Sequence, residues 1–265
     1  MPSDNPNSVP LNDIVTFLDN ILESSTTPDY PNALNGLQLS NNGSVTKVAA
    51  AVDFSSRVVR SAIAERADLL LVHHGMFWPG LQPIVRQVYS RLGDLFNANI
   101  AVYASHLPLD RHSHFGNNVL LAKTLGLVPS GQFALFKDIF IGVRGDANIL
   151  TSTLVKRAQI FSNLHGGTTV TAGDTYPDRK TRRWAICTGA GAFAETLEEA
   201  TRENIDTLIV GEGPHWTAVE ALERELSVIY VGHYASETLG VYALAEEISQ
   251  QFHLDHVKIA APTGL

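Results

Sequence analysis

The stretch Asp68-Leu-Leu-Leu-Val-His-His-Gly75 places two histidines directly after a near-continuous apolar run. An uninterrupted run of this kind is typical of a β-strand that helices cover on both faces. The run therefore predicts a strand over 68–72 within a parallel sheet. In open parallel sheets, ligands bind outside the carboxyl ends of the strands. His73 and His74, which follow this strand, are therefore the first candidates for a functional site.

The alternation of short apolar runs with segments of helical spacing continues on both sides of this stretch. Further strands are predicted over 45–52, 99–103, 139–144, 183–187, 207–210 and 228–231. Helices are predicted over 55–67, 83–97, 117–125, 147–161, 193–204, 217–226 and 237–251. Such alternation indicates an α/β protein with mostly parallel strands.

The chain has 265 residues, enough for one large domain or two smaller ones with a proper core. A seam near 128–131 separates one series of strands and helices from the next. We therefore expect two α/β lobes. The first would comprise residues 1–130 with 232–265 and contain most of the candidate site, and the second would comprise residues 131–231.

Composition excludes several classes of protein. The formal net charge of −8 disfavours general binding of nucleic acid, because an acidic surface repels phosphate backbones. The dense basic run over 178–183 is expected to be a solvated turn before a strand, with a binding role as the alternative. No apolar run approaches the roughly 18 residues that a membrane span needs, and the first ten residues do not resemble a signal peptide. We expect a cytoplasmic protein, with its single cysteine, Cys187, buried as a small hydrophobe.

Polar clusters follow four of the predicted strands. They are His73-His74 after 68–72, Ser105 to Asp110 after 99–103, Gly211 to Trp216 after 207–210, and Gly232 to Glu237 after 228–231. Each cluster contains histidine or carboxylate groups at the end of a strand where ligands gather. Solubility alone does not explain this convergence, so the clusters are candidates for one metal site.

Spacing constrains how these residues would bind metal. Adjacent residues of an extended strand point to opposite sides, so His73 and His74 would serve two ions side by side, unless the chain already turns at Gly75. His233 and Glu237 are spaced i, i+4, which at a helix N-terminus allows both to clamp one ion. Purely structural explanations stay open for each pair: polar residues at a strand end, and a capped helix.

Asp110 follows Pro108 by two residues, which predicts a rigid loop that projects the carboxylate rather than a regular helix. A surface ion pair with Arg111 is the alternative. The combined set of imidazole nitrogens and carboxylate oxygens suits Zn, Mn, Fe, Co or Ni better than Ca or Mg. The proposed metal ligands are His73, His74, Asp110, His233 and Glu237.

Two divalent ions would leave such a site net positive, so a small anionic substrate such as a phosphate ester is expected. Paired ions of this kind support hydrolysis. Glu212 and His106 lie at strand ends beside the ligands and are candidates for catalytic acid–base or ligand-orienting roles, with structural hydrogen bonding as the alternative.

Several longer stretches support this interpretation and follow one another along nearly the whole chain. They are Asn35-Gly-Leu-Gln-Leu39, Leu71-Val-His-His-Gly-Met-Phe-Trp78, His106-Leu-Pro-Leu-Asp110, Gly116-Asn-Asn118, Gly189-Ala-Gly191, Gly211-Glu212 and Gly232-His-Tyr-Ala-Ser-Glu237. With these motifs the sequence resembles the Nif-three-like family of dinuclear-metal-centre proteins, often labelled GTP cyclohydrolase 1 type 2 homologues.

The resemblance implies two similar three-layer α/β lobes that face each other across a metal-containing cleft, assembled as a toroidal homohexamer. It implies one ion on His73, Asp110 and Glu237. A second ion would take His74 and His233, with Glu237 as the bridge. The expected function is a metal-dependent hydrolase of a nucleotide or another small phosphorylated substrate. The alternative is a non-enzymatic metal-binding or scaffold hexamer.

Overall fold

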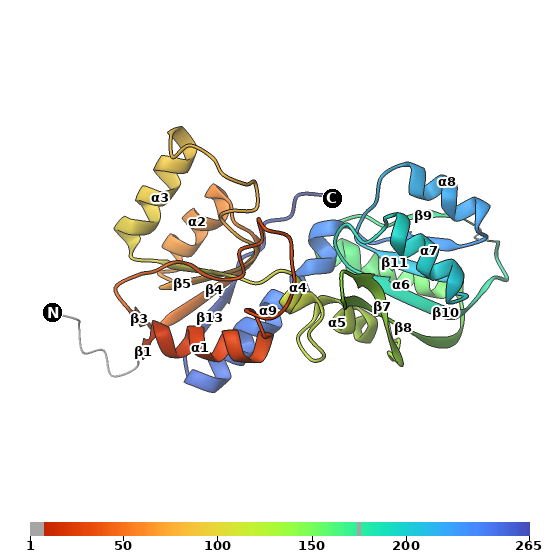
Figure 1. The fold of residues 1–265 in the computed structure, drawn as a ribbon, viewed down its shortest axis with the longest axis horizontal. Helices are drawn as coiled ribbons and strands as arrows, with labels where there is room; N and C mark the ends of the chain where they lie inside the picture. The colour runs from red at the N-terminus through yellow and green to blue at the C-terminus, as the bar shows by residue number, and fades with distance from the viewer. Residues whose placement is uncertain (1–7, 174–175) are drawn as a thin grey trace. The chain divides into compact units, whose positions relative to one another are not determined.

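The computed structural model describes residues 8–173 and 176–265. Residues 1–7, part of the stretch that does not resemble a signal peptide, lie outside the described residues. The protein has a mixed α/β fold (Figure 1). It divides into two compact units, Met1–Leu109 with Val241–Ala261 and Asp110–Gly240 with Pro262–Leu265.

The first unit contains a five-stranded sheet in the order β13-β4-β5-β6-β2. Its strands are β2 (Gly36–Leu39), β4 (Lys47–Asp53), β5 (Leu69–His74), β6 (Ala101–Ala104) and β13 (Asp255–Lys258). The first four strands of that order pair in parallel, and β2 pairs antiparallel with β6. A short antiparallel ribbon joins β1 (Val9–Pro10) to β3 (Ser44–Val45).

Helices cover both faces of this sheet. Figure 1 shows α2 (Ser56–Ala64) and α3 (Arg86–Ala98) on one face. The opposite face is covered by α1 (Leu11–Leu22) and by the part of α9 (His233–Phe252) that follows residue 240. The apolar side chains between the helices and the sheet are buried, which supplies the main stabilisation of the layers. The first unit is therefore a three-layer α/β arrangement, as predicted.

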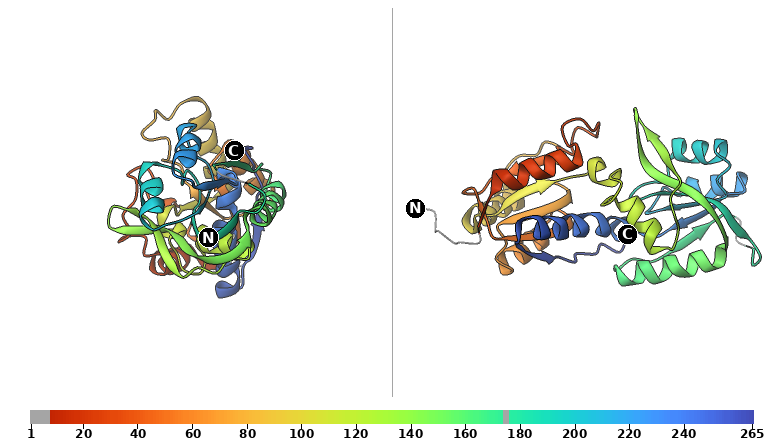
Figure 2. Two further views of the ribbon diagram at one scale, coloured as in Figure 1. Left: turned by 90° about the vertical axis from the view of Figure 1, so that its right-hand side faces the viewer. Right: turned by 90° about the horizontal axis from the view of Figure 1, so that it is seen from below.

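The second unit contains a six-stranded sheet in the order β7-β8-β10-β11-β12-β9. Its strands are β7 (Gly131–Phe136), β8 (Ile139–Leu150), β9 (Val170–Ala172), β10 (Lys180–Cys187), β11 (Thr207–Val210) and β12 (Ser227–Tyr230). Its helices are α5 (Asn117–Thr124), α6 (Thr151–Leu164), α7 (Ala194–Arg202) and α8 (Trp216–Glu223). Figures 1 and 2 show α5 and α6 on one face of the sheet and α7 and α8 on the other.

The expectation of mostly parallel strands is wrong for this second sheet. Its central strands β10, β11 and β12 are parallel, but β7, β8 and β9 pair antiparallel with their neighbours. Strands β7 and β8 are joined by the two residues 137–138, and so short a connection can join antiparallel strands only.

The two units differ in their boundaries from the lobes expected from the sequence, where the second lobe was to begin at residue 131. Residues 110–130 belong to the second unit, because the apolar side chains of α5 and the turn after it pack there. Leu121, Leu125 and Leu127 share one buried cluster with Trp184 of β10.

Two local expectations are corrected by the structure. The helix expected over 147–161 begins at Thr151, because residues up to Leu150 pair with β10 as part of β8. Arg179 is buried rather than solvated: its guanidinium donates to the carbonyl oxygens of Asp206 and Glu225. Cys187 is buried, as expected. Among the described residues, no helix is both long enough and apolar enough to cross a membrane.

Candidate metal centre

Three imidazoles cluster at the carboxyl ends of β5 and β6. His73 and His74 are the last two residues of β5, and His106 lies two residues after the end of β6. The metal-ligating nitrogens of these three side chains lie within 4.8 Å of one another, and all three residues are buried. His73 and His74 both belong to β5, and the centroids of their rings are 4.8 Å apart. The prediction that the two histidines serve two ions side by side stays a prediction.

The two strand-end histidines each use Nδ1 to donate a hydrogen bond. The Nδ1 of His73 donates to the carbonyl oxygen of Ser105 at 2.8 Å. The Nδ1 of His74 donates to Oδ1 of Asp53, the last residue of β4, at 2.8 Å. Because a carbonyl or carboxylate oxygen only accepts, the proton of each neutral ring lies on Nδ1 and the lone pair lies on Nε2. This is the protonation that a metal-binding histidine needs.

His106 is held in the same way by a buried carboxylate. Its Nδ1 donates to Oδ1 of Asp29 at 2.9 Å, and its backbone N–H donates to the side-chain oxygen of Asn35 at 2.7 Å. Burial alone would raise the pKa of Asp29, but the hydrogen bond and the charge of His106 hold this pKa below its ordinary value. Asn35 also donates to the other oxygen of Asp29 at 2.8 Å.

The stretch Asn35-Gly-Leu-Gln-Leu39 also fixes the turn that follows His74. The side-chain oxygen of Gln38 accepts from the backbone N–H of Met76 at 2.6 Å. The amide of Gln38 lies so close to Gly75 that a Cβ at residue 75 would overlap it. A glycine at this position therefore allows the amide to support the turn.

In the second unit, His233 and Glu237 both lie in the first turns of α9, which begins earlier than the helix predicted over 237–251. Nε2 of His233 is 3.2 Å from Oε2 of Glu237, and Nδ1 of His233 donates to Oε1 of Glu212 at 2.8 Å. Burial would lower the pKa of His233, but the carboxylates of Glu237 and Glu212 raise this pKa to about 9. Glu212 therefore orients His233 through the ring nitrogen that faces away from Glu237.

The Glu237 carboxylate is 2% exposed and packs against glycine backbone. Gly189, which follows β10, has φ +63°, and a Cβ there would overlap Oε1 of Glu237. The N–H of Gly189 donates to the hydroxyl of Ser236 at 3.0 Å, and a Cβ at Gly211 would come within 2.6 Å of the same hydroxyl. The glycines after β10 and β11 thus let two loops close around the start of α9.

Asp110 lies in α4 (Leu107–Asp110), a single turn of helix, and not in the loop that was expected. Pro108 is compatible with this turn because the N–H that proline lacks has no partner at a helix start. Oδ1 of Asp110 accepts from the amide of Asn117 at 2.8 Å. The side-chain oxygen of Asn117 in turn accepts from the N–H of Gly240 in α9 at 2.7 Å.

Each unit thus assembles part of the predicted donor set. The first unit brings His73, His74 and His106 together. In the second unit Glu212, His233 and Glu237 are in contact. The carboxylates of Asp110 and Glu237 both act on Cys187: burial is the larger cause, and these charges further raise the pKa of its thiol.

Sequence reasoning named Glu212, which orients His233, as a candidate ligand-orienting residue, but it gave no such role to Asp29 or Asn117. Asp29 lies 77 residues from His106, so spacing contains no signal for it, whereas Asn117 lies only seven residues after Asp110, in the stretch Gly116-Asn-Asn118. Asp53 was also missed, but its position at the carboxyl end of a predicted strand was a usable signal.

These features define a mixed α/β protein with imidazole and carboxylate donors at the carboxyl ends of its parallel strands. The model of the Duf34/NIF3 family (NGG1p interacting factor 3) matches residues 9–263. The chain belongs to this family.

Curated relatives and solved structures agree with this assignment. A "GTP cyclohydrolase 1 type 2 homolog" from Archaeoglobus fulgidus is 35% identical over 96% of this chain and 99% of its own length. The protein of the same name from Pyrococcus abyssi is 38% identical over 96% of this chain and 98% of its own length. The solved structure of protein ybgI, described as of unknown function, has a TM-score of 0.86 at 30% identity and covers 97% of this chain and 100% of its own. A solved structure from Thermus thermophilus, that of TTHA1606, has a TM-score of 0.82 at 34% identity and covers 97% of this chain and 100% of its own.

Proposed function

We propose that this protein binds two divalent metal ions and hydrolyses a nucleotide or another small phosphorylated substrate. One ion would take His73, Asp110 and Glu237. The other would take His74 and His233, with Glu237 shared by both. Asp110 and Glu237 are part of the second unit but lie close along the chain to the points where it joins the first, at residues 109–110 and 240–241.

One observation carries this proposal. Four histidines of the two units each donate from Nδ1 to an oxygen acceptor, namely His73, His74, His106 and His233. Metal-binding histidines in proteins almost always make such a bond, because it fixes the ring and leaves Nε2 for the metal. The residues present therefore fit a metal centre of mixed nitrogen and oxygen donors, which suits Zn, Mn, Fe, Co or Ni.

Two divalent ions on this donor set would supply the charge that stabilises the attacking and leaving oxygens of a hydrolytic displacement. The chain itself contributes proton-transfer groups. A ring nitrogen of His106 lies within 4.8 Å of ring nitrogens of His73 and His74, and His106 would hold or release a proton there. Glu212 orients His233 with one oxygen and keeps its second carboxylate oxygen for a proton.

A cavity in the second unit supports a small-molecule substrate. Its volume is about 270 Å³, and Glu212, His215 and Tyr230 are among the residues that line it. A space of this size suits one small molecule and not a polymer. Since Glu212 both lines the cavity and orients His233, a substrate held there would lie beside the proposed ligands.

The test combines metal analysis with turnover. The purified protein should contain transition metal, and it should hydrolyse at least one member of a panel of nucleotides, GTP included, and phosphoesters with Mn or Zn added. His74→Ala and Glu237→Ala should lose metal and activity, whereas His253→Ala, an exposed histidine, should lose neither. Equal turnover by the wild type and Glu237→Ala would contradict the hydrolase proposal.

A non-enzymatic metal-binding or scaffold protein is the second candidate. The network of buried amides and carboxylates around the histidines favours it, since such a network also stabilises a metal that only orders the fold. Chelation would then lower the melting temperature strongly in a protein without turnover on the panel. In either case we propose a homohexamer, supported by an exposed apolar stripe along α3 that Val85, the N-cap residue, forms with Tyr89 and Phe96.

A further inference from the structure

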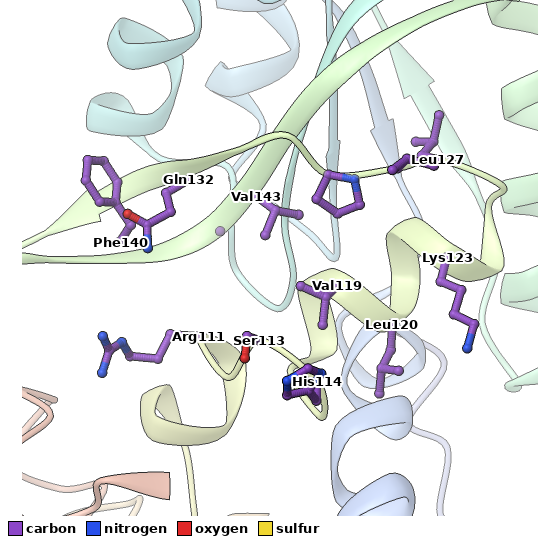
Figure 3. A pocket seen from close by; sticks show the side chains of 13 residues that line it. Arg111, Ser113, His114, Val119, Leu120, Lys123, Leu127, Gln132, Phe140 and Val143 are labelled. Atoms are coloured by element: carbon purple, nitrogen blue, oxygen red, sulfur yellow. The ribbon is translucent and has the colours of Figure 1, made fainter. Parts of the chain in front are cut away.

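A larger cavity lies elsewhere in the second unit. Its volume is about 620 Å³, and it is lined by residues of α5, of the segments 111–114 and 127–129 on either side of this helix, and of β7 and β8 (Figure 3). Among the described residues that line it, none is a proposed metal ligand. The proposed function therefore assigns no role to this cavity.

The walls of this cavity combine apolar and cationic side chains. Figure 3 shows Val119 and Leu120 of α5 on one side and Phe140 and Val143 of β8 on the other. Arg111 and Lys123 lie toward opposite ends of this apolar group in the same view. Serine hydroxyl and glutamine amide groups add donors, and none of the described lining residues has a carboxylate.

The absence of a carboxylate is informative because the chain as a whole is acidic, with a formal net charge of −8. A local excess of cations in a concave apolar wall concentrates anions at that point. The volume lies within the range of about 300–1,000 Å³ that is usual for small-molecule sites. A small organic anion with an apolar body fits both the apolar wall and the cationic side chains, whereas a neutral apolar molecule or an inorganic anion fits only one of the two.

We propose that this cavity binds a small organic anion that has an apolar body and a phosphate or carboxylate head. The apolar body would lie between α5 and β8, where its burial removes hydrocarbon surface from water. The head would lie against Arg111 or Lys123, with donor groups of the cavity completing its hydrogen bonds. This site does not depend on the proposed metal centre.

The experiment is a fluorescence titration of the purified protein with anilinonaphthalenesulfonate, an amphipathic anion whose emission rises in apolar surroundings. Hexyl phosphate, hexanoate and hexanol then compete for the bound probe, which separates a phosphate head, a carboxylate head and the apolar body alone. The titration is repeated after chelation, so that loss of metal and loss of this site can be told apart. The variants are Arg111→Gln, Lys123→Glu and Phe140→Ala. Lys156→Glu on α6 is the matched control, a lysine that does not line the cavity.

We expect saturable binding that chelation leaves unchanged, and displacement by hexyl phosphate or hexanoate but not by hexanol. Lys123→Glu or Arg111→Gln should weaken binding about fivefold or more, because a charge at contact distance is removed or reversed. Phe140→Ala should weaken it through the apolar wall, whereas Lys156→Glu should bind as the wild type does. Circular dichroism checks that each variant is folded. If Phe140→Ala does not fold, Arg111→Gln and Lys123→Glu are sufficient to test the proposal.

Three results would overturn the proposal. The first is equal probe affinity in Arg111→Gln, Lys123→Glu and Lys156→Glu. The second is displacement by hexanol as efficient as displacement by the two anions. The third is probe binding that appears only when the protein is diluted below the concentration at which it self-associates, which would mean that another copy of the chain covers the cavity.

Discussion

At Gly189 a single added methyl group would fall on the Glu237 carboxylate. The residue combines φ +63° with direct packing against Oε1 of Glu237, so Gly189→Ala introduces backbone strain and a steric overlap together. We expect a loss of about 2–4 kcal/mol in the free energy of unfolding, together with loss of bound metal. Urea unfolding and metal analysis of the same preparation measure both effects.

Gly43→Ala is the control for the effect of backbone strain alone. Gly43 has φ +96°, but a Cβ there would meet nothing within 4 Å. This variant should lose about 1 kcal/mol and keep its metal. If both variants retained metal equally, the packing of Gly189 on Glu237 would have no role in positioning the carboxylate.

Asn117 is the residue that links Asp110 to α9, through bonds of 2.8 Å to Asp110 and 2.7 Å to Gly240. Asn117→Ala removes both bonds and, with them, the restraint that Asn117 places on the Asp110 carboxylate. Loss of a partner that orients a metal ligand typically lowers metal affinity about 10–100-fold. Competition with a chromophoric chelator would measure this change. Asn163→Ala, at an exposed position of α6, should leave the affinity unchanged.

At the scale of elements, the sequence predicted the central parallel strands and the helices that follow them, because apolar runs and helical spacing are local signals. The strand predicted over 207–210 is β11 in the structure, and the predicted helix over 193–204 contains α7. Edge strands such as β2 and β9 were not predicted, because partners distant in sequence form them. Helix α1 was also missed, although Leu11, Ile14, Leu18 and Leu22 bury one face of it at helical spacing.

The candidate site shows the same contrast between features with a local sequence signal and features that distant residues form. The proposed ligands were visible in the sequence because they lie in the polar clusters that follow predicted strands. Glu212, which orients His233, was visible for the same reason, whereas orienting residues whose contacts join distant parts of the chain were not. His106 and Asp29, for example, are 77 residues apart and meet only once β6 and the segment after α1 are folded together.

Strand β6 and helix α1 are joined by a buried hydroxyl. The Tyr103 hydroxyl donates to Oδ1 of Asp19 at 2.7 Å and lies 3.1 Å from the hydroxyl of Ser24. Burial, together with the Asp19 carboxylate, raises the pKa of Tyr103 far above its ordinary value. The folded chain therefore keeps this phenol neutral, whereas the unfolded chain ionises it near pH 10.

The stability that Tyr103 contributes is fully present below about pH 10 and is lost as the pH rises further. The free energy of unfolding of the wild type should fall by about 1.4 kcal/mol per pH unit more steeply than that of Tyr103→Phe in this range. Tyr176→Phe, at an exposed tyrosine, should keep the wild-type slope. Urea titrations at several values of pH give these slopes, and identical slopes for wild type and Tyr103→Phe would contradict the argument.

At the scale of the whole molecule, the apolar stripe of α3 predicts self-association. Tyr89 is 69% exposed at its centre, and Leu81 just before the helix is fully exposed. Tyr89→Lys should shift the protein to smaller species, since it places a charge within an apolar contact. Light scattering after size-exclusion chromatography would report the molar mass. Ile160→Lys on α6 is the matched control, because Ile160 is 62% exposed and lies outside the stripe.

The glycines beside the candidate centre have a consequence for reading related genes. Gly75 leaves space for the Gln38 amide, and Gly189 leaves space for the Glu237 carboxylate. A relative can retain every proposed donor and still be unable to position them if either glycine has become alanine. A sequence search that scores the donors alone would count such a chain as able to bind metal. A search that also requires these two glycines would separate it from the relatives that can position the donors.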